Sequence, residues 1–416
     1  MRYIHRELEK SIKPFLKRKE VLAIVGSRQV GKTTFLKYLA SQLEKQGKLI
    51  KFITFEKRGD LQLFDNVEDF KELHQKYQVV IIDEFQYAQD GGRKLKYLFD
   101  TTKTKYIISG SSSLDIKFQT GKYMVGRMFK FMLWPFSFRE YLSFANRELY
   151  QALVSRIPDA FSVSKKEAFG SEINSRLEKL FEDYLVFGGY PAVVLAKTRR
   201  EKGKILESIL ENYLLKDIRT LLQLSTESEL IQLVKLFATQ IGNLINYTEL
   251  SNTSGLNYKG VLQHLEILKQ TYVVDLIRPY FTNKRTEISK NPKVYFIDTG
   301  FKNLALSDFR KLEPRKDAGA LVENYVFMAL KRKTNGFKNI NFWRTKSKAE
   351  VDFVIQKENK IIPLEVKYSS SPSAGKSFYS FINKFSPEKG YIFTRGFFDV
   401  RRIGETKVCF IPVYYL

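Results

Sequence analysis

The chain has 416 residues, of which 44% are hydrophobic, and its 70 Lys and Arg against 45 Asp and Glu give a net charge of +25. This composition predicts a globular protein of roughly two to four domains, and no apolar run is long enough to span a membrane. One cysteine and three scattered histidines exclude an internal disulfide and a zinc site, so we expect any metal to be held by carboxylates or phosphate.

Residues 1–20 form a basic lead-in that we expect to be helical. It has no apolar signal segment, and a single cysteine suits a reducing compartment, so we expect a cytoplasmic protein.

A phosphate-binding loop follows, because residues 26–33 read GSRQVGKT and fit the pattern G-x-x-x-x-G-K-[ST]. Residues 21–25 predict a buried parallel strand, and residues 33–46 have the apolar spacing of a helix. Backbone N–H groups and the helix dipole would bind the phosphates of ATP, with Lys32 at the β- and γ-phosphates and Thr33 on Mg²⁺. A chance glycine-rich turn is the alternative, and these flanks disfavour it. The predicted nucleotide-binding residues are Gly26, Ser27, Arg28, Gln29, Val30, Gly31, Lys32, Thr33 and Thr34.

Residues 48–56 predict a second strand, with its helix somewhere in residues 61–77. Residues 79–86 (VVIIDEFQ) predict a third strand that ends in two acids, Asp83 and Glu84. A parallel strand delivers such carboxylates beside the phosphates, where Asp83 would hold Mg²⁺ through water and Glu84 would polarise the attacking water. The alternative is a charged strand end that caps the next turn.

Residues 105–113 (KYIISGSSS) predict a fourth strand, and Ser111 is the candidate sensor of the γ-phosphate or its water; an ordinary serine-rich turn is the alternative. Residues 121–142 place Arg127 on a glycine-flanked loop before a fifth strand. An arginine there can act as a finger, in cis or across the interface of a homo-oligomer, although a solvated arginine has the same local pattern.

The order GSRQVGKT, VVIIDE, IISGSSS, GR…WPFSFREYL and FGGYPAVV (residues 187–194) resembles the prokaryotic AAA-type ATPases that carry an uncharacterised C-terminal domain. The resemblance covers nearly the whole chain. It implies an ATPase core over residues 1–150 with a parallel sheet of order 5-1-4-3-2. It further implies a helical lid within residues 151–225, whose first 25 residues are polar and broken like a surface linker.

Residues 226–300 have the layout of a winged helix. Helices are expected at residues 227–242, 246–255 and 257–271, the second with a Thr248 cap and a terminal Gly255, and strands at residues 272–277 and 293–298. The residues that would contact DNA are Asn257, Tyr258, Lys259, Lys284 and Arg285. The net charge attracts polyanions, nucleic acid first, but solvated lysines and winged helices that only pack are the alternatives.

Residues 301–416 carry a second set of acids. A helix at residues 319–333 bears Glu323, and residues 349–356 and 361–368 predict a hairpin. Its four-residue turn would set Asp352 opposite Glu365 and Glu350 opposite Lys367, and two facing carboxylates repel unless a divalent cation lies between them. Pro363 within the second strand suggests an edge or a bulge.

This arrangement of helix Glu, strand Asp and Glu-x-Lys is similar to the restriction-endonuclease-like nucleases. The resemblance implies that Asp352 and Glu365 bind Mg²⁺, that Glu323 is an accessory acid on the metal, and that Lys367 orients or activates the attacking water. Val351 stands where that family's pattern expects proline. A fold that has lost cleavage activity and an ordinary salt-bridge ladder are the alternatives.

The sequence therefore predicts an α/β, Mg²⁺-dependent ATP hydrolase of the AAA-like class, coupled to DNA binding or to metal-dependent DNA cleavage. The alternative is an ATP-gated regulatory switch whose inactive winged-helix and nuclease-like domains bind protein partners. No membrane partner is expected.

Overall fold

The computed structural model describes residues 3–111, 123–211, 228–281, 283–333, 339–357 and 360–416. The chain divides into two compact units, which we term the N-terminal unit (Met1–Pro135 with Gln270–Tyr272) and the C-terminal unit (Phe136–Lys269 with Val273–Leu416). The finer boundaries expected near residues 150, 225 and 300 stay predictions. Within the described ranges, no helix combines the length and apolar character needed to cross a bilayer.

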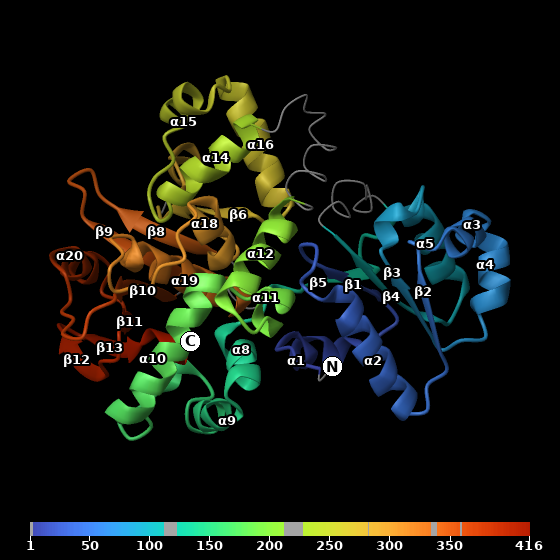
Figure 1. The fold of residues 1–416 in the computed structure, drawn as a ribbon, viewed down its shortest axis with the longest axis horizontal. Helices are drawn as coiled ribbons and strands as arrows, with labels where there is room; N and C mark the ends of the chain where they lie inside the picture. Colours follow the sequence, from blue (N-terminus) through green and yellow to red (C-terminus); the bar gives the residue numbers. More distant parts are fainter. Residues whose placement is uncertain (1–2, 112–122, 212–227, 282, 334–338, 358–359) are drawn as a thin grey trace. The chain divides into compact units, whose positions relative to one another are not determined.

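A parallel five-stranded sheet of order β2-β3-β4-β1-β5 forms the centre of the N-terminal unit (Figure 1). Read from its other edge, this is the order 5-1-4-3-2. The strands are β1 (Val21–Val25), β2 (Ile50–Thr54), β3 (Val79–Asp83), β4 (Lys105–Gly110) and β5 (Met128–Met132). Every residue of β1, β3 and β4 is buried, because the inner strands of a parallel sheet are covered on both faces.

The helices of the N-terminal unit are α1 (Leu8–Ile12), η1 (Lys13–Phe15), α2 (Lys32–Lys45), α3 (Arg58–Asp65), α4 (Val67–His74), η2 (Phe85–Tyr87) and α5 (Gly91–Thr101). Helix α2 packs against β2, β3 and β4. The lead-in helix is shorter than expected, because Pro14 interrupts it and converts its end to a 3₁₀ turn. Ser112 and Ser113 at the end of the predicted fourth strand, and Gly121, lie outside the described residues.

The helices of the C-terminal unit are α8 (Phe138–Ala145), α9 (Arg147–Arg156), η3 (Ala160–Ser162), α10 (Ser171–Phe187), α11 (Pro191–Leu195), α12 (Arg199–Leu210), α14 (Ser228–Thr239), α15 (Tyr247–Ser254), α16 (Tyr258–Gln270, whose last residue counts with the N-terminal unit), α17 (Lys284–Ser289), α18 (Thr299–Ala305), α19 (Ala318–Lys333), α20 (Lys376–Phe385) and η5 (Val413–Tyr415). Helices α10, α11 and α12 lie in the segment where a helical lid is expected, and the FGGYP turn (residues 187–191) separates α10 from α11. Residues 212–227, at the end of the expected lid, lie outside the described residues, and the lid role stays a prediction.

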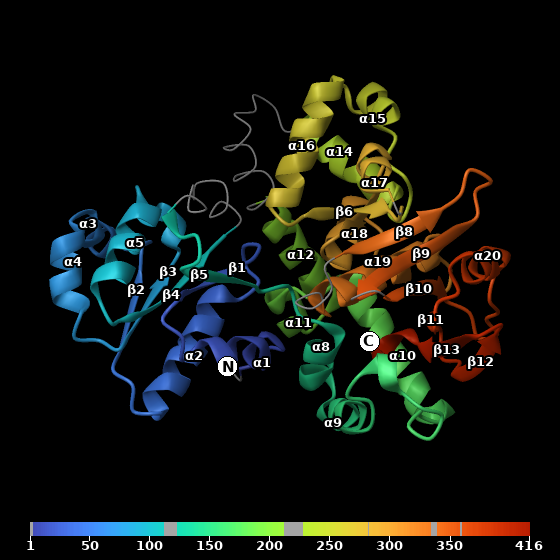
Figure 2. The same ribbon diagram turned by 180° about the vertical axis from the view of Figure 1, so that it is seen from behind.

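An eight-stranded mixed sheet of order β12-β13-β11-β10-β9-β8-β6-β7 forms the centre of the C-terminal unit (Figure 2). Its strands are β6 (Val274–Pro279), β7 (Lys293–Phe296), β8 (Ile340–Arg344), β9 (Glu350–Lys357), β10 (Lys360–Lys367), β11 (Lys389–Thr394), β12 (Asp399–Ile403) and β13 (Thr406–Pro412). Arg278 of β6 pairs with Asn341 of β8. The β6-β7 ribbon, expected as the wing, therefore belongs to the same sheet as the predicted nuclease-like hairpin.

Helices α14, α15 and α16 followed by the β6-β7 ribbon occur in the predicted order, while the winged-helix assignment itself stays a prediction. The expected Thr248 cap is wrong. Helix α15 begins at Tyr247, and the side chain of Asn246 caps it by accepting the N–H of Glu249 at 3.2 Å. Gly255 does end this helix in the left-handed conformation, at φ 79°.

The expectation that Pro363 marks an edge strand or a bulge is also wrong, because β10 lies inside the sheet between β9 and β11 and pairs with β9 in continuous register. The pairing of β10 with β11 begins one residue later, at Leu364. Pro363 thus precedes that ladder, and its missing N–H removes no paired donor from it.

The FGGYP turn crosses the segment that follows β7. Asp298 accepts the N–H of Gly189 at 2.8 Å and that of Gly300 at 2.9 Å. Gly188 has φ +77°, and a Cβ there would overlap the Asp298 carboxylate. The two glycines of the turn therefore let α10 end directly against the carboxylate that caps α18.

Candidate nucleotide site and carboxylate cluster

The phosphate-binding loop lies between β1 and α2, as the sequence predicts. Gly31 is the N-cap of α2, in the left-handed conformation at φ 92°. The Lys32 side chain is buried, and its ammonium donates to the carbonyls of Gly26 at 3.1 Å and Ser27 at 3.0 Å. A Cβ on Gly26 would overlap the Leu133 carbonyl, so the loop can follow this path only with glycine there.

The two acids of β3 lie beside a serine that the sequence analysis did not single out. Ile82 of β3 pairs with Ile108 of β4, so the next pair along is Asp83 and Ser109. The Ser109 hydroxyl is fully buried; it donates to the Asp83 carboxylate and accepts the N–H of Glu84 at 3.2 Å. Ser109 therefore holds the side chain of one acid and the backbone of the other.

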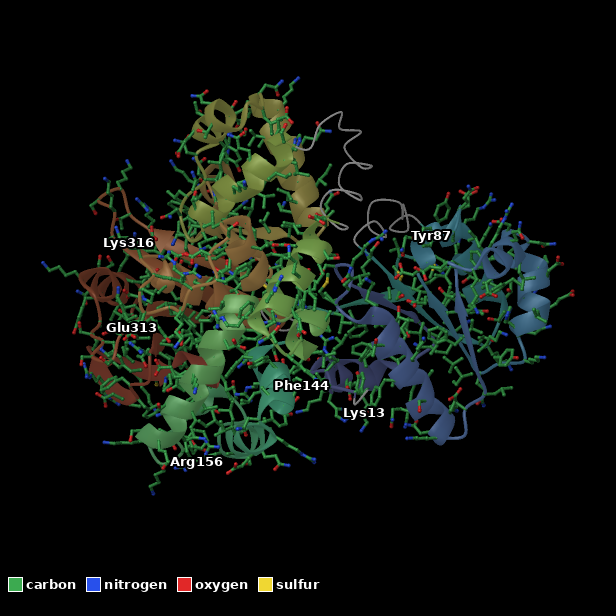
Figure 3. The ribbon with its side chains drawn as sticks, viewed as in Figure 1. Lys13, Tyr87, Phe144, Arg156, Glu313 and Lys316 are labelled. Atoms are coloured by element: carbon green, nitrogen blue, oxygen red, sulfur yellow. The ribbon has the colours of Figure 1, made fainter. Side chains whose placement is uncertain are left out.

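Glu84 leaves the strand in a left-handed conformation at φ 53°, which is uncommon for a residue with a side chain. The amide of Gln86 donates to its carboxylate. Three residues beyond Glu84, Tyr87 lies at the surface of the N-terminal unit with 42% of its area exposed (Figure 3). The conformation turns Glu84 out of the strand direction, and this strain is typical of functional positions.

The predicted nucleotide-site residues follow the carboxyl ends of three neighbouring strands. Strand β4 lies between β1 and β3, and Val25 pairs with Gly110, so the loop after β1 and Ser111 after β4 begin at the same level. Asp83 ends β3 at this edge. Such an edge is where open parallel sheets bind ligands. The individual roles of Lys32, Thr33, Asp83, Glu84 and Ser111 stay predictions.

Ser109→Ala is expected to lower the kcat for ATP hydrolysis roughly tenfold and to leave nucleotide affinity within about twofold. The change removes the hydroxyl that positions Asp83 and Glu84 but leaves the loop intact. Steady-state turnover and fluorescent-nucleotide titration measure the two quantities. Ser111→Ala is the comparison, and a Ser109→Ala enzyme with wild-type kcat contradicts the positioning role.

Arg127 lies at the opposite end of the strands. Strand β5 pairs with β1 so that Met128 lies beside Val21 and Met132 beside Val25. Arg127 is therefore at least about 13 Å along the strand from the edge where the loop begins, and a finger acting in cis is excluded. Its side chain pairs with Asp100 at 3.1 Å on the surface. A role across a subunit interface stays a prediction.

If Arg127 acts in trans, Arg127→Ala should lower kcat about 10³-fold without weakening nucleotide binding, and mixing it with Lys32→Ala should restore part of the turnover. Asp100→Ala is the matched control, because it breaks the same surface ion pair and leaves the guanidinium. Equal turnover of wild type and Arg127→Ala at saturating ATP, or equal loss in both variants, would refute the finger.

In the C-terminal unit, the hairpin has the expected register. The β9–β10 ladder runs from Lys360 and Lys357 to Leu364 and Phe353, and the expected pairs of Glu365 with Asp352 and of Lys367 with Glu350 would lie just beyond its end. Yet Lys367 does not neutralise Glu350. Its ammonium contacts Glu365 on its own strand at 2.7 Å. A cation of the chain itself therefore lies beside Glu365, where the sequence suggested a divalent ion.

Glu323 on α19 joins this set, together with two residues that the sequence analysis left out. Its carboxylate accepts the Tyr295 hydroxyl at 2.6 Å and lies 3.5 Å from the ammonium of Lys293. That ammonium also lies 2.5 Å from Glu350, which is paired with Arg344 at 2.6 Å. The carboxylate cluster, as we term it, comprises Glu323, Glu350, Asp352 and Glu365 with the bases Lys293, Arg344 and Lys367.

Burial is the main cause of the pKa shifts in this cluster. It raises the pKa of Glu323 to about 7, with a further contribution from Asp352 that Lys293 partly offsets. Burial also raises the pKa of Asp352 and of Glu365, opposed chiefly by Lys293 for the former and by Lys367 for the latter. The predicted acids thus share one poorly solvated site.

The metal roles of Glu323, Asp352 and Glu365 stay predictions, but the side chains as arranged do not form a metal-binding group. Across the described ranges, no three His, Cys, Asp or Glu side chains are placed to hold an ion together. One oxygen of Asp352 accepts the N–H of Val366 at 2.8 Å. A buried oxygen of Glu365 has no hydrogen-bond partner.

Lys293 could not be found from its local sequence. It begins a short apolar strand in which a lysine is expected to be solvated, and it lies 30 residues before Glu323 in the chain. The only available signal was that a lysine heading an apolar β-strand has to find a carboxylate if the strand is buried.

Sequences from distant organisms are similar to most of this chain. An uncharacterized protein of Haemophilus influenzae is 23% identical over 84% of this chain and 82% of its own length, and one of Methanocaldococcus jannaschii is 27% identical over 86% and 76%. Among solved structures, DnaA bound to AMPPCP and single-stranded DNA matches with a TM-score of 0.31 (10% identity, 64% of this chain, 90% of that one). Aeropyrum pernix ORC1 in complex with DNA gives 0.32 (12%, 74% and 93%). These TM-scores are too low to establish a common fold.

Three family models match parts of the chain. Residues 178–329 match a domain of unknown function (DUF8612), and residues 318–416 match another domain of unknown function (DUF4143). Residues 18–142 match the family described as AAA domain. This last segment, which is similar to AAA domains, contains the phosphate-binding loop and the Asp83–Glu84 pair.

Proposed function

We propose that the chain is a Mg²⁺-dependent ATP hydrolase whose turnover is coupled to DNA binding. The ATP hydrolase activity is inferred from one edge of the sheet. There the phosphate-binding loop follows β1, Ser109 lies near the end of the adjacent strand β4, and the Asp83–Glu84 pair stands at the end of β3. Loop N–H groups and Lys32 bind phosphate charge, and Glu84 orients the water that attacks the γ-phosphate.

The residues at this edge fit Mg²⁺, which prefers oxygen ligands and keeps several of its waters. Asp83 supplies a carboxylate that Ser109 holds in one orientation, and Thr33 supplies a hydroxyl in the first turn of α2. The ion would neutralise charge that develops on the phosphates. The residues of the chain bind the nucleotide, fix its orientation and position the water.

Charge and exposure support DNA as the partner. The net charge is +25, and three residues at the start of α16 (Asn257, Tyr258 and Lys259) are exposed. Tyr258 exposes 53% of its area, and its ring contacts the ring of Tyr247 edge-on with the centroids 5.9 Å apart. Arg285 on α17 is also exposed. An aromatic ring beside cationic side chains can stack on a base and contact phosphate.

ATP turnover measured with and without DNA at increasing salt tests this proposal. We expect stimulation by DNA that falls steeply between about 50 and 200 mM salt, because phosphate contacts release counterions. Lys259→Ala should weaken DNA binding and reduce its salt dependence, while Lys235→Ala, an exposed lysine on α14, should not. If ATP turnover depends on Lys32 but is unchanged by added DNA, the assignment as an ATP hydrolase remains. The alternative function, a switch that binds protein partners, is then favoured.

DNA cleavage by the C-terminal unit stays a prediction that this proposal does not require. The acids predicted for cleavage do lie together, but their bases already neutralise much of their charge.

A further inference from the structure

Lys293 is the most deeply buried cation of the carboxylate cluster. Its side chain is only 1% exposed, and its ammonium lies 2.5 Å from Glu350 on β9 and 3.5 Å from Glu323 on α19. Burying an ammonium is unfavourable unless carboxylates pair with it. Its position joins the edge strand β7 to a helix and to a strand that is not its sheet neighbour.

The charge of the Lys293 ammonium also acts on the carboxylate of Asp352. Burial raises the pKa of Asp352, and the charge of Lys293 opposes this rise. Burial lowers the pKa of Lys293, but Glu323, Asp352 and Glu350 together raise it above its ordinary value. The charge of Lys293 therefore offsets the charges of Glu323, Glu350 and Asp352 together. One compact positive charge among three carboxylates from two other elements is the arrangement expected of a bound cation.

We propose that the ammonium of Lys293 takes the place of a divalent cation in the carboxylate cluster. A metal ion among the same carboxylates would be close to a like charge in a poorly solvated site, where Coulomb repulsion is weakly screened. The chain thereby supplies its own counter-ion and keeps β7, β9 and α19 together without metal. The cluster then acts as a fixed structural support and not as a metal-dependent phosphodiesterase.

One oxygen of Glu365 is available as a metal ligand if Lys293 is removed. This oxygen is buried and accepts no hydrogen bond, while the other oxygen pairs with Lys367. When Lys293 is replaced by a smaller neutral residue, the carboxylates lose their shared cation. A divalent ion can then enter and take oxygens of Asp352, Glu323 and Glu365, which are ligands of the kind that Mg²⁺ and Mn²⁺ prefer.

Mn²⁺ binding by the full chain, measured by electron paramagnetic resonance without nucleotide, tests the proposal. Wild type and Asp352→Asn should bind Mn²⁺ alike, because no ion occupies the cluster. Lys293→Ala should bind one Mn²⁺ more than wild type, with an affinity at least tenfold higher than that of wild type. Its thermal stability should rise when this ion is bound. The double variant Lys293→Ala/Asp352→Asn should lose both effects, and Lys293→Arg, which keeps the charge, should behave as wild type.

A wild-type Mn²⁺ site that disappears in Asp352→Asn would overturn the proposal directly. A folded Lys293→Ala protein that gains no Asp352-dependent site would overturn it as well, because the ammonium would not be what excludes the ion. If Lys293→Ala does not fold, Lys293→Gln removes the charge while keeping most of the volume, and the same two criteria apply to it.

Discussion

Lys32→Ala is expected to abolish ATP binding, whereas Glu84→Gln is expected to retain binding and reduce hydrolysis roughly 100-fold or more. Lys32 is a buried cation whose ammonium lies along the phosphate-binding loop, so its removal takes away charge that the polyphosphate needs. Glu84 lies beyond the end of β3 and acts on water, so its neutral amide analogue leaves the phosphate cradle complete. Isothermal titration with ATP and steady-state turnover measure the two effects separately.

Two control substitutions can be made on α2, the helix that begins with Lys32. Lys37→Ala and Glu44→Gln make the same chemical changes at exposed positions of α2, and both should leave binding and turnover unchanged. Full turnover in Glu84→Gln would remove the assignment of Glu84 as the water-positioning group. ATP binding by Lys32→Ala equal to that of wild type would contradict the assignment of residues 26–33 as the phosphate-binding loop.

The position of the candidate phosphate-binding loop between β1 and α2 could be predicted because its signals are local. A glycine pattern between an apolar strand and an amphipathic helix needs no knowledge of the rest of the chain. Ser109 was missed because its role depends on which strands are neighbours. Once the order 5-1-4-3-2 is accepted, the residue of β4 beside Asp83 could have been counted, but one serine in KYIISGSSS has no local mark that separates it from Ser111.

The carboxylate cluster shows where local reasoning fails. Strand alternation and turn length correctly gave the register of the β9–β10 hairpin up to the pair of Leu364 and Phe353. They could not reveal Lys293, because a contact between β7, β9 and α19 depends on the tertiary fold. The interpretation of Pro363 failed for a related reason: a proline in a strand excludes only a paired N–H, and the β10–β11 ladder begins after it.

Gly188→Ala is expected to destabilise the C-terminal unit by about 4 kcal/mol or more, a large share of a typical domain's stability. Gly188 has φ +77° and ψ −168°, a region that is essentially restricted to glycine and costs other residues of order 1–3 kcal/mol. A methyl group there would also overlap the Asp298 carboxylate, which accepts the N–H groups of Gly189 and Gly300. Each such charged hydrogen bond contributes roughly 1.5–3 kcal/mol.

Urea denaturation followed by tryptophan fluorescence measures this effect in the correct unit. The chain has two tryptophans, so a Trp134→Phe background leaves Trp343, which is buried in the C-terminal unit, as the reporter. Gly203→Ala is the matched control, because this glycine lies within α12 with nothing near its Cβ position. It should stabilise the unit by about 0.5–1 kcal/mol through helix propensity. Similar urea midpoints for Gly188→Ala and Gly203→Ala would contradict the expected cost of placing a methyl group against the Asp298 carboxylate.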